Sequence, residues 1–181
     1  MASTPDFERI RREVWDNSNL GNALPGATPR ARISILAPGG EPLRATAGQP
    51  LIICTSVENL SARPFPREAS YGRRLVNLGA QLCSVDGRLL DLDYARSRLP
   101  RDLEGGGTVE VPIEITAPKE AGEYQLKFDL VNEGIDWFEK CGSPTTTHRL
   151  IVQSAILPAE YRPQRVGWLR RMTARLLTAS R

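Results

Sequence analysis

The strongest constraint on the fold is a strict alternation of apolar and polar residues between Gly122 and Val131. Four large apolar side chains occupy every second position, at Tyr124, Leu126, Phe128 and Leu130. This period of two places all four on one face of a β-strand, because successive side chains of a strand point to opposite sides. A second layer has to cover that face, so the pattern predicts a strand in a layered β-structure.

Six other stretches show the same period, and turn residues such as Asp86-Gly87 separate them. With 122–131, the predicted strands cover residues 31–36, 50–58, 75–84, 88–92, 108–115 and 146–153. Seven short strands predict an all-β, antiparallel sandwich of the immunoglobulin or fibronectin type III kind. Pro112 lacks the N–H that a central strand needs, which places the strand 108–115 at an edge.

Cysteine usage indicates a reducing compartment. The Gly122-x-Tyr124 pattern resembles the tyrosine corner of immunoglobulin-like domains, but Leu126 stands where the second cysteine of such domains would be. The three cysteines are widely spaced and form no C-x-x-C pair, so neither a disulfide framework nor a zinc site is indicated. The chain has no N-terminal apolar signal segment and no run of about 18 apolar residues. We therefore expect a cytoplasmic protein.

Two predicted helices flank the sandwich. Thr4-Pro5-Asp6 is typical of a helix start, so residues 1–29 are assigned to a short N-terminal helix and a linker. The sandwich is assigned to residues 30–153. Residues 154–181 are assigned to a linker and a basic amphipathic helix. In the latter, Trp168, Leu169, Met172 and Leu176 can share one face. The contact candidates are Arg165, Trp168, Arg171, Met172 and Arg175.

Charge is unevenly distributed along the chain. Residues 158–181 hold six arginines and one glutamate, a net charge of +5, within a chain whose formal net charge is +3. The body is therefore slightly acidic, which argues against a nucleic-acid partner because such surfaces have to neutralise phosphates. The basic helix is expected to contact an anionic membrane surface, at the inner membrane, or a protein partner, or to fold back on the sandwich.

The sequence offers no convergent catalytic set. His148 is the single histidine and lies in a predicted strand, and none of the common phosphate-binding, nucleophile-elbow or metalloprotease motifs is present. The pair Asp91 and Asp93 is a weak signal for calcium and is better explained as a solvated strand edge. We expect no enzyme activity, no cofactor and no metal.

The predicted topology brings three connections to one end of the sandwich: 59–72, 93–107 and 132–145. Aromatic rings stack on sugars, while neighbouring charged groups hydrogen-bond sugar hydroxyls, so this end is a candidate glycan site. The candidate ligand-binding residues are Trp137, Asp136, Glu133, Tyr94, Arg96, Arg98 and Arg101. In the alternative, Trp137 and Phe138 close the end of the core.

The order of several short motifs resembles one family of sandwich modules. These motifs are Leu99-Pro100-Arg101-Asp102-Leu103, then V-x-V-x-I-x-I, then Ala121-Gly122-x-Tyr124-x-Leu126, and Leu130-Val131-x-Glu133-Gly134-Ile135-x-Trp137-Phe138. Together they resemble the immunoglobulin-like accessory modules of bacterial glycosyltransferases and methyltransferases of surface-polysaccharide synthesis. The layout is also similar to the C-terminal O-antigen-binding domain of polysaccharide ABC exporters. Those modules often carry Trp-Pro after the second strand, where this chain has Phe65-Pro66.

Two functions follow from these observations. The resemblance implies a non-catalytic module that binds a glycan or lipid-linked glycan, beside a glycosyltransferase, methyltransferase or transporter partner. The alternative is a protein-interaction module that docks to a membrane-associated partner through its C-terminal helix. An exposed Trp137 beside Asp136 and the arginine loop would favour the glycan module. A buried Trp137 together with an uncovered edge strand or an uncovered apolar helix face would favour the interaction module.

Overall fold

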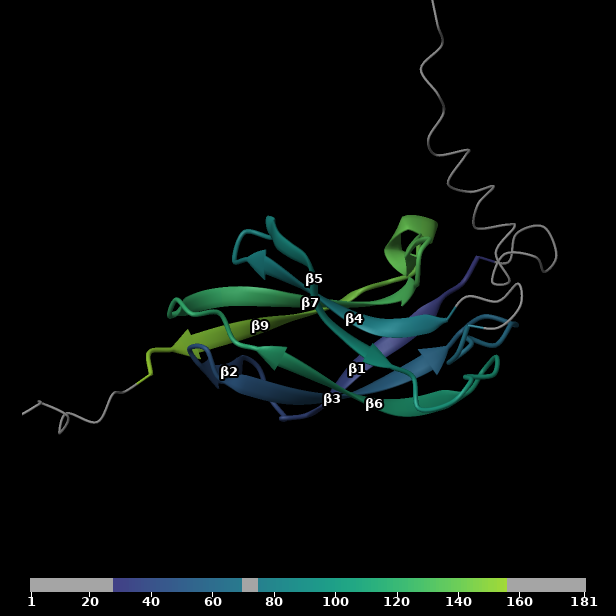
Figure 1. Cartoon of the computed structure of the whole chain (residues 1–181), viewed down its shortest axis with the longest axis horizontal. Coiled ribbons are helices and arrows are strands. Elements are labelled where there is room, and N and C mark those ends of the chain that lie inside the picture. Colours follow the sequence, from purple (N-terminus) through teal and green to yellow (C-terminus); the bar gives the residue numbers. More distant parts are fainter. Residues whose placement is uncertain (1–27, 70–74, 156–181) are drawn as a thin grey trace, which may run out of the picture.

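The chain folds as a β-sandwich, with two sheets packed face to face (Figure 1). The computed structural model describes residues 28–69 and 75–155. The predicted N-terminal and C-terminal helices lie outside these residues, so they and the predicted division of the chain stay predictions. Within the described ranges, no helix has the length and apolar character needed to span a membrane.

Among the described residues, three strands form the smaller sheet and six form the larger one. The smaller sheet has the order β1-β3-β6, with bounds Ala31–Ala37, Pro50–Asn59 and Thr108–Thr116. The larger sheet has the order β2-β9-β7-β4-β5, and β8 pairs with β7. Its strands are β2 (Leu43–Thr46), β9 (Thr146–Gln153), β7 (Gly122–Asn132), β4 (Val76–Ser84), β5 (Leu89–Arg98) and β8 (Asp136–Trp137). A short 3-10 helix, η1 (Phe138–Cys141), follows β8.

The strand count and the pairing differ from the expectation of seven antiparallel strands. The described residues form nine strands, and β2 pairs with β9 in parallel register. With four and two residues, β2 and β8 are too short to show a periodic pattern. Strand β5 extends to Arg98 because its second half continues to pair with β4, so residues 93–98 are not the loop that was predicted.

The alternating face of β7 lies in the core, as predicted. Leu126, Phe128 and Leu130 are fully buried between the sheets. The tyrosine corner is also confirmed, since the Tyr124 hydroxyl donates a 3.1 Å hydrogen bond to the Glu120 carbonyl. Within the part of the chain that the structure describes, strand β6, which contains Pro112, pairs only with β3 and is an edge of its sheet.

Two sets of contacts fix the ends and sides of the sandwich. On one side, the Ser97 hydroxyl donates to the Pro112 carbonyl over 2.6 Å, which joins β5 to β6 in the other sheet. At one end, an isolated bridge pairs Phe65 with Leu103, and the Glu133 N–H donates to the Leu75 carbonyl over 3.0 Å. The first contact joins the predicted connections 59–72 and 93–107, and the second places the connection 132–145 beside the residue that precedes β4.

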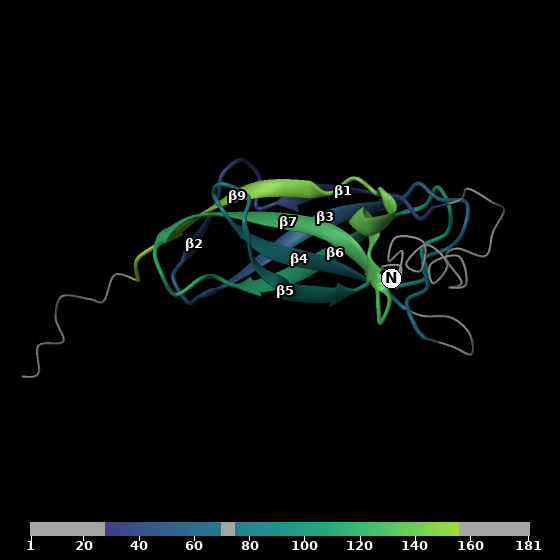
Figure 2. The same cartoon turned by 90° about the horizontal axis from the view of Figure 1, so that it is seen from above.

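The segment that follows β7 turns back over the outer face of the larger sheet. β8 pairs with β7 at Val131 and Asn132, and η1 lies next to it (Figure 2). The alternate residues of β4 face the core. Its other residues, on the outer face beneath this segment, are small or polar: Asn77, Gly79 and Gln81. This arrangement positions the candidate site.

Candidate functional site

Trp137 lies against the outer face of the larger sheet, over Gly79. Its side chain is buried, with 4% of the residue exposed. A Cβ atom at Gly79 would lie 2.5 Å from Cη2 of Trp137, closer than real Cβ contacts come. Only a glycine at this position of β4 leaves room for the indole ring. The ring therefore occupies the space that a side chain at position 79 would fill.

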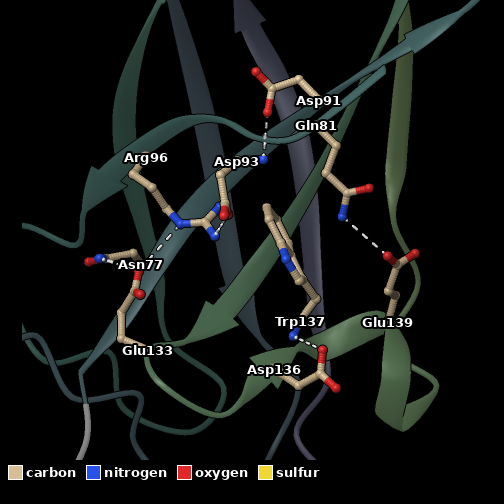
Figure 3. Close-up of polar contacts among 9 residues, drawn as sticks. All are labelled: Asn77, Gln81, Asp91, Asp93, Arg96, Glu133, Asp136, Trp137 and Glu139. Atoms are coloured by element: carbon tan, nitrogen blue, oxygen red, sulfur yellow. Dashed lines mark hydrogen bonds and ion pairs between the residues drawn. The ribbon is translucent and has the colours of Figure 1, made fainter. Parts of the chain in front are cut away.

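Arg96 covers the ring. Its guanidinium carbon lies 4.1 Å from the centroid of the Trp137 ring, and two acids hold the guanidinium in place (Figure 3). Asp93 forms an ion pair with Nη2, and Glu133 lies 3.4 Å from Nε. Asn77 donates a 2.8 Å hydrogen bond to the same Glu133 carboxylate. The result is a charged cluster built by β4, β5 and the β7–β8 turn.

A second polar group lies on the other side of Trp137 (Figure 3). The Lys127 ammonium donates to Glu139 of η1 over 2.7 Å, and the Gln81 side-chain amide donates to the same carboxylate over 3.2 Å. Burial opposes ionisation of Glu139, but these bonds outweigh it, so the pKa of the Glu139 carboxyl is lowered. Glu139 therefore ties η1 to β4 and β7 as a carboxylate.

Asp129 is the buried acid beneath η1. It is fully buried in β7 and accepts hydrogen bonds of 2.8 Å from the backbone N–H groups of Leu130 and Glu139. Burial raises the pKa of the Asp129 carboxyl to about 7, although both N–H donors favour the charged form. Asp129 thus holds the start of η1 against β7. It also gives the outer face of the larger sheet a carboxyl group with a pKa of about 7.

The structure brings together some of the predicted ligand-binding residues. Trp137, Arg96 and Glu133 are in contact, and Asp136 accepts a 2.9 Å hydrogen bond from the Trp137 backbone N–H. Arg98 lies at the next position of β5 on the same face, opposite Asn77, and is exposed.

Tyr94 and Arg101 point elsewhere. The Tyr94 hydroxyl bonds to the Thr116 carbonyl of β6 in the other sheet, and the pKa of this half-buried phenol is raised to about 12, chiefly by burial. Arg101 donates to the Thr108 carbonyl over 3.1 Å, at the start of β6. Neither side chain contributes to the Trp137 cluster.

Sequence reasoning missed the residues that position the ring. These are Asn77, Gly79, Gln81, Asp93, Asp129 and Glu139. One signal was available, since an isolated glycine inside a strand pattern marks a close approach of another group. Gly79 interrupts the run from Val76 to Ser84 in this way.

The two adjacent aromatic residues have different roles. Phe138 is fully buried in the core, where its ring meets Phe65 edge to face with centroids 5.2 Å apart. Trp137 lies outside the core, between the sheet and Arg96. The core-closing interpretation is therefore right for Phe138 only, and Trp137 offers no open ring face on which a sugar can stack.

A separate apolar surface lies at the β4–β5 hairpin. Four large apolar side chains there are between 42% and 54% exposed: Val85, Leu89, Leu90 and Leu92. We call these four residues the hairpin surface. The turn is well fixed, because the Gln125 side-chain amide donates to the Val85 carbonyl over 2.8 Å and Ser84 bonds to Asp86 over 2.5 Å.

Comparisons with known proteins do not assign a family. No family model matches the chain, and no curated protein matches it. Among solved structures, it is similar to the CARDB domain of PF1109 from Pyrococcus furiosus (13% identity, TM-score 0.44, 70% of this chain and 96% of that chain). It is also similar to a β-glucosidase from Listeria innocua in complex with isofagomine (14% identity, TM-score 0.45, 72% of this chain and 17% of that chain). A third similar structure is a PapD-like domain of human CEP192 (19% identity, TM-score 0.33, 75% of this chain and 92% of that chain). Similarity at this level assigns no function to the chain.

Proposed function

We propose that this chain is a non-catalytic interaction module that binds a protein partner through the hairpin surface. The observation that carries the proposal is the exposure of Val85, Leu89, Leu90 and Leu92 within one hairpin. Single exposed apolar residues are ordinary, but here four lie within residues 85–92 of one hairpin, a local concentration that is typical of an interaction surface. Trp137 is buried, and the hairpin half of β5 lies at the edge of the larger sheet, two features that support an interaction module over a glycan module.

The charge of the hairpin indicates the chemistry of the partner. Asp86, Asp91 and Asp93 flank the apolar residues, against Arg88 and against Arg96, which pairs with Asp93. The Ser84 hydroxyl, the largest influence, and backbone N–H groups lower the pKa of the exposed Asp86 carboxyl, so it stays charged at neutral pH. A partner that combines apolar residues with lysines or arginines would complement this surface.

The shape of the hairpin favours a helix over an added strand. The register between β4 and β5 shifts between Ala80 and Leu82 and again at Cys83, so this part of the edge is irregular. The Asp93 backbone N–H already donates to the Asp91 carboxylate over 3.0 Å. Strand addition needs a regular row of free backbone groups, whereas the apolar face of an amphipathic helix needs only exposed side chains.

Site-specific photo-crosslinking tests this function. The full chain would carry benzoylphenylalanine at position 90, and the control would carry it at position 52, where Ile52 of β3 is 58% exposed in the other sheet. We expect position 90, and not position 52, to give an adduct with one identified protein whose crosslinked segment is apolar and basic. Equal adducts at both positions, or none at position 90, would contradict the proposal.

Glycan binding is the second candidate, as the resemblance to polysaccharide modules implies. The observation that favours it is the rim of Asp93, Glu133 and Asp136 around Arg96 and Trp137, which offers hydrogen-bond partners for sugar hydroxyls. Stacking on the indole would require Arg96 to leave the ring. A saturable change in tryptophan fluorescence with bacterial polysaccharide fragments, lost in a folded Trp137→Ala variant, would support this candidate. A glycosyltransferase, methyltransferase or transporter would then be the partner.

A further inference from the structure

We propose that Asp129 and Glu139 form a proton-dependent latch, which holds the turn at residues 139–141 on the outer face of the larger sheet in acid and releases it as the pH rises to neutrality. The latch uses none of the residues of the hairpin surface. It regulates a different part of the molecule, the outer face of β4 and β7 that η1 covers.

Two carboxylates beside η1 share a single cation. Asp129 and Lys127 both lie on the outer face of β7, because the alternate residues of that strand face the core. The Lys127 ammonium binds Glu139 over 2.7 Å, and no cation of the described residues lies within ion-pair distance of Asp129. Arg96, the cation of β5 on this face, is held by two other acids. An ionised Asp129 is therefore a fully buried charge without a counter-ion, which is costly.

The polar contacts beneath η1 also lack a proton donor. Asp129 accepts the Glu139 backbone N–H over 2.8 Å, and the Gln81 side-chain amide donates to the Glu139 carboxylate over 3.2 Å (Figure 3). The other end of that amide, Oε1, is buried and has no hydrogen-bond partner among the described residues. Asp129 pairs with Gly79, two residues from Gln81, so the two side chains are diagonal neighbours on one face. A proton on Asp129 supplies a donor where an acceptor lacks one.

The direction of the pH effect follows from the burial of Asp129. Burial raises the pKa of its carboxyl from 3.8 to about 7 while the turn is closed. Once the turn is released, the carboxyl reaches water and its pKa returns toward the ordinary value. Release therefore expels a proton between about pH 4 and 7, and each pH unit in this range favours the released state about tenfold. Above pH 7 the carboxyl is ionised in both states, so the balance no longer changes.

Other charged and titratable groups lie on the elements packed against Asp129. Glu139 raises the pKa of Asp129 and Lys127 lowers it, and both effects are smaller than that of burial. The pKa of Glu139 is itself lowered and that of the buried Cys83 thiol is raised, so both groups keep one charge state over this range. The full set is Lys127 of β7, Cys83 of β4, Arg96 of β5, Asp136 of β8, and Glu139, Lys140 and Cys141 of η1.

The backbone provides an anchor and a hinge for this turn. Phe138 is the buried residue of η1 and stays in the core. At the other end, Gly142 has a φ of 83°, and nothing lies within 4 Å of the position that a Cβ would take there. Residues 139–141 can therefore leave the sheet between a fixed ring and an unobstructed glycine.

Hydrogen exchange of the full-length protein, followed by NMR between pH 5 and 8, tests the latch. The reporters are the amide of Glu139, which donates to Asp129, and that of Gly142, which donates to the Glu139 carbonyl over 3.0 Å. After correction for the intrinsic rate, we expect protection to fall about tenfold per pH unit up to about pH 7 and then to level off. Asp129→Asn should remove the pH dependence. Asp136→Asn, the matched acid of the same segment, should retain it.

Low concentrations of urea separate release of the turn from unfolding of the whole domain. Release exposes little surface, so urea should leave the exchange of the two reporter amides unchanged while it speeds exchange in β3. If the reporters and β3 respond equally to urea, the turn opens only with the domain and the latch does not exist. Protection that is independent of pH in the wild type, or a wild-type profile in Asp129→Asn, would also overturn the inference.

Glu139→Gln provides a second variant that keeps the backbone N–H accepted by Asp129. It removes a neighbouring negative charge and frees Lys127, and both changes favour an ionised Asp129. We expect the fall in protection to level off at a lower pH than in the wild type. An unchanged pH profile would show that Asp129 and Glu139 do not act together.

Discussion

The guanidinium of Arg96 lies over the ring of Trp137, with 4.1 Å between its carbon and the ring centroid. Arg96 comes from β5 and Trp137 from β8, and Gly79 of β4 provides the floor beneath them. This pair decides what the outer face of the larger sheet presents to other molecules, because it replaces an accessible aromatic ring with a half-buried cation held by Asp93 and Glu133.

The Arg96–Trp137 contact should be measurable as a coupling energy. A double-mutant cycle with Arg96→Ala and Trp137→Phe, followed by urea unfolding, is expected to give about 1 kcal/mol of coupling, as a partly desolvated cation–π pair does. Glu133 retains its hydrogen bond from Asn77 in these variants. A coupling energy near zero would show that the contact between the guanidinium and the ring does not stabilise the folded protein.

Replacement of Gly79 should be costly. In Gly79→Ala the new Cβ would meet the Trp137 ring at 2.5 Å and the Arg96 guanidinium, so we expect a loss of about 1–3 kcal/mol in unfolding free energy. Gly39→Ala is the matched control, because nothing lies within 4 Å of a Cβ at that position. Urea denaturation of both variants checks this, and an equal effect of the two substitutions would contradict the close packing at Gly79.

Asp129 should make stability depend on pH. Its folded pKa of about 7 lies above its usual value of 3.8, so between these pH values the folded state binds the proton more tightly than the unfolded state. Stability from this group is fully present below about pH 4 and is lost as the pH rises to 7. The free energy of unfolding of wild type relative to Asp129→Asn should therefore fall by up to about 4 kcal/mol over this range.

The comparison with Asp129→Asn isolates that group. Glu139 has a lowered pKa and contributes stability in the opposite direction, which is lost as the pH falls. Lys127 and Glu139 are present in both proteins, so their contributions cancel in the difference to first order. Urea unfolding at several pH values between 4 and 8 provides the data. A difference independent of pH would show that Asp129 keeps an ordinary pKa.

The three cysteines should differ in reactivity. Burial raises the pKa of the Cys83 thiol, and the residue is only 5% exposed, whereas Cys54 and Cys141 are partly exposed. Since the thiolate is the reactive form, iodoacetamide should modify Cys83 most slowly in the native protein. Mass spectrometry of peptides after timed labelling measures the three rates. In urea the rates should converge, and preferential labelling of native Cys83 would contradict this.

Local pattern was sufficient for much of the fold. The period of two at β7, the edge position implied by Pro112 and the tyrosine corner at Tyr124 could all be predicted, because each depends on residues close in sequence. The two shortest strands, β2 and β8, could not be predicted in this way, and neither could the continuation of β5 through Arg98. Their formation depends on pairing with strands distant in the chain, which no local period records.

For the candidate site, the sequence by itself determined which groups were available: a tryptophan, acids beside it and arginines upstream. Tertiary structure alone decided their arrangement. It placed Arg96 over Trp137, turned Tyr94 toward β6 and separated Trp137 from the core that contains Phe138. The physical reason is that side-chain exposure depends on which strands become neighbours. Gly79 admits the indole ring only after β4, β5 and β8 have come together, and that meeting also leaves Leu89, Leu90 and Leu92 uncovered.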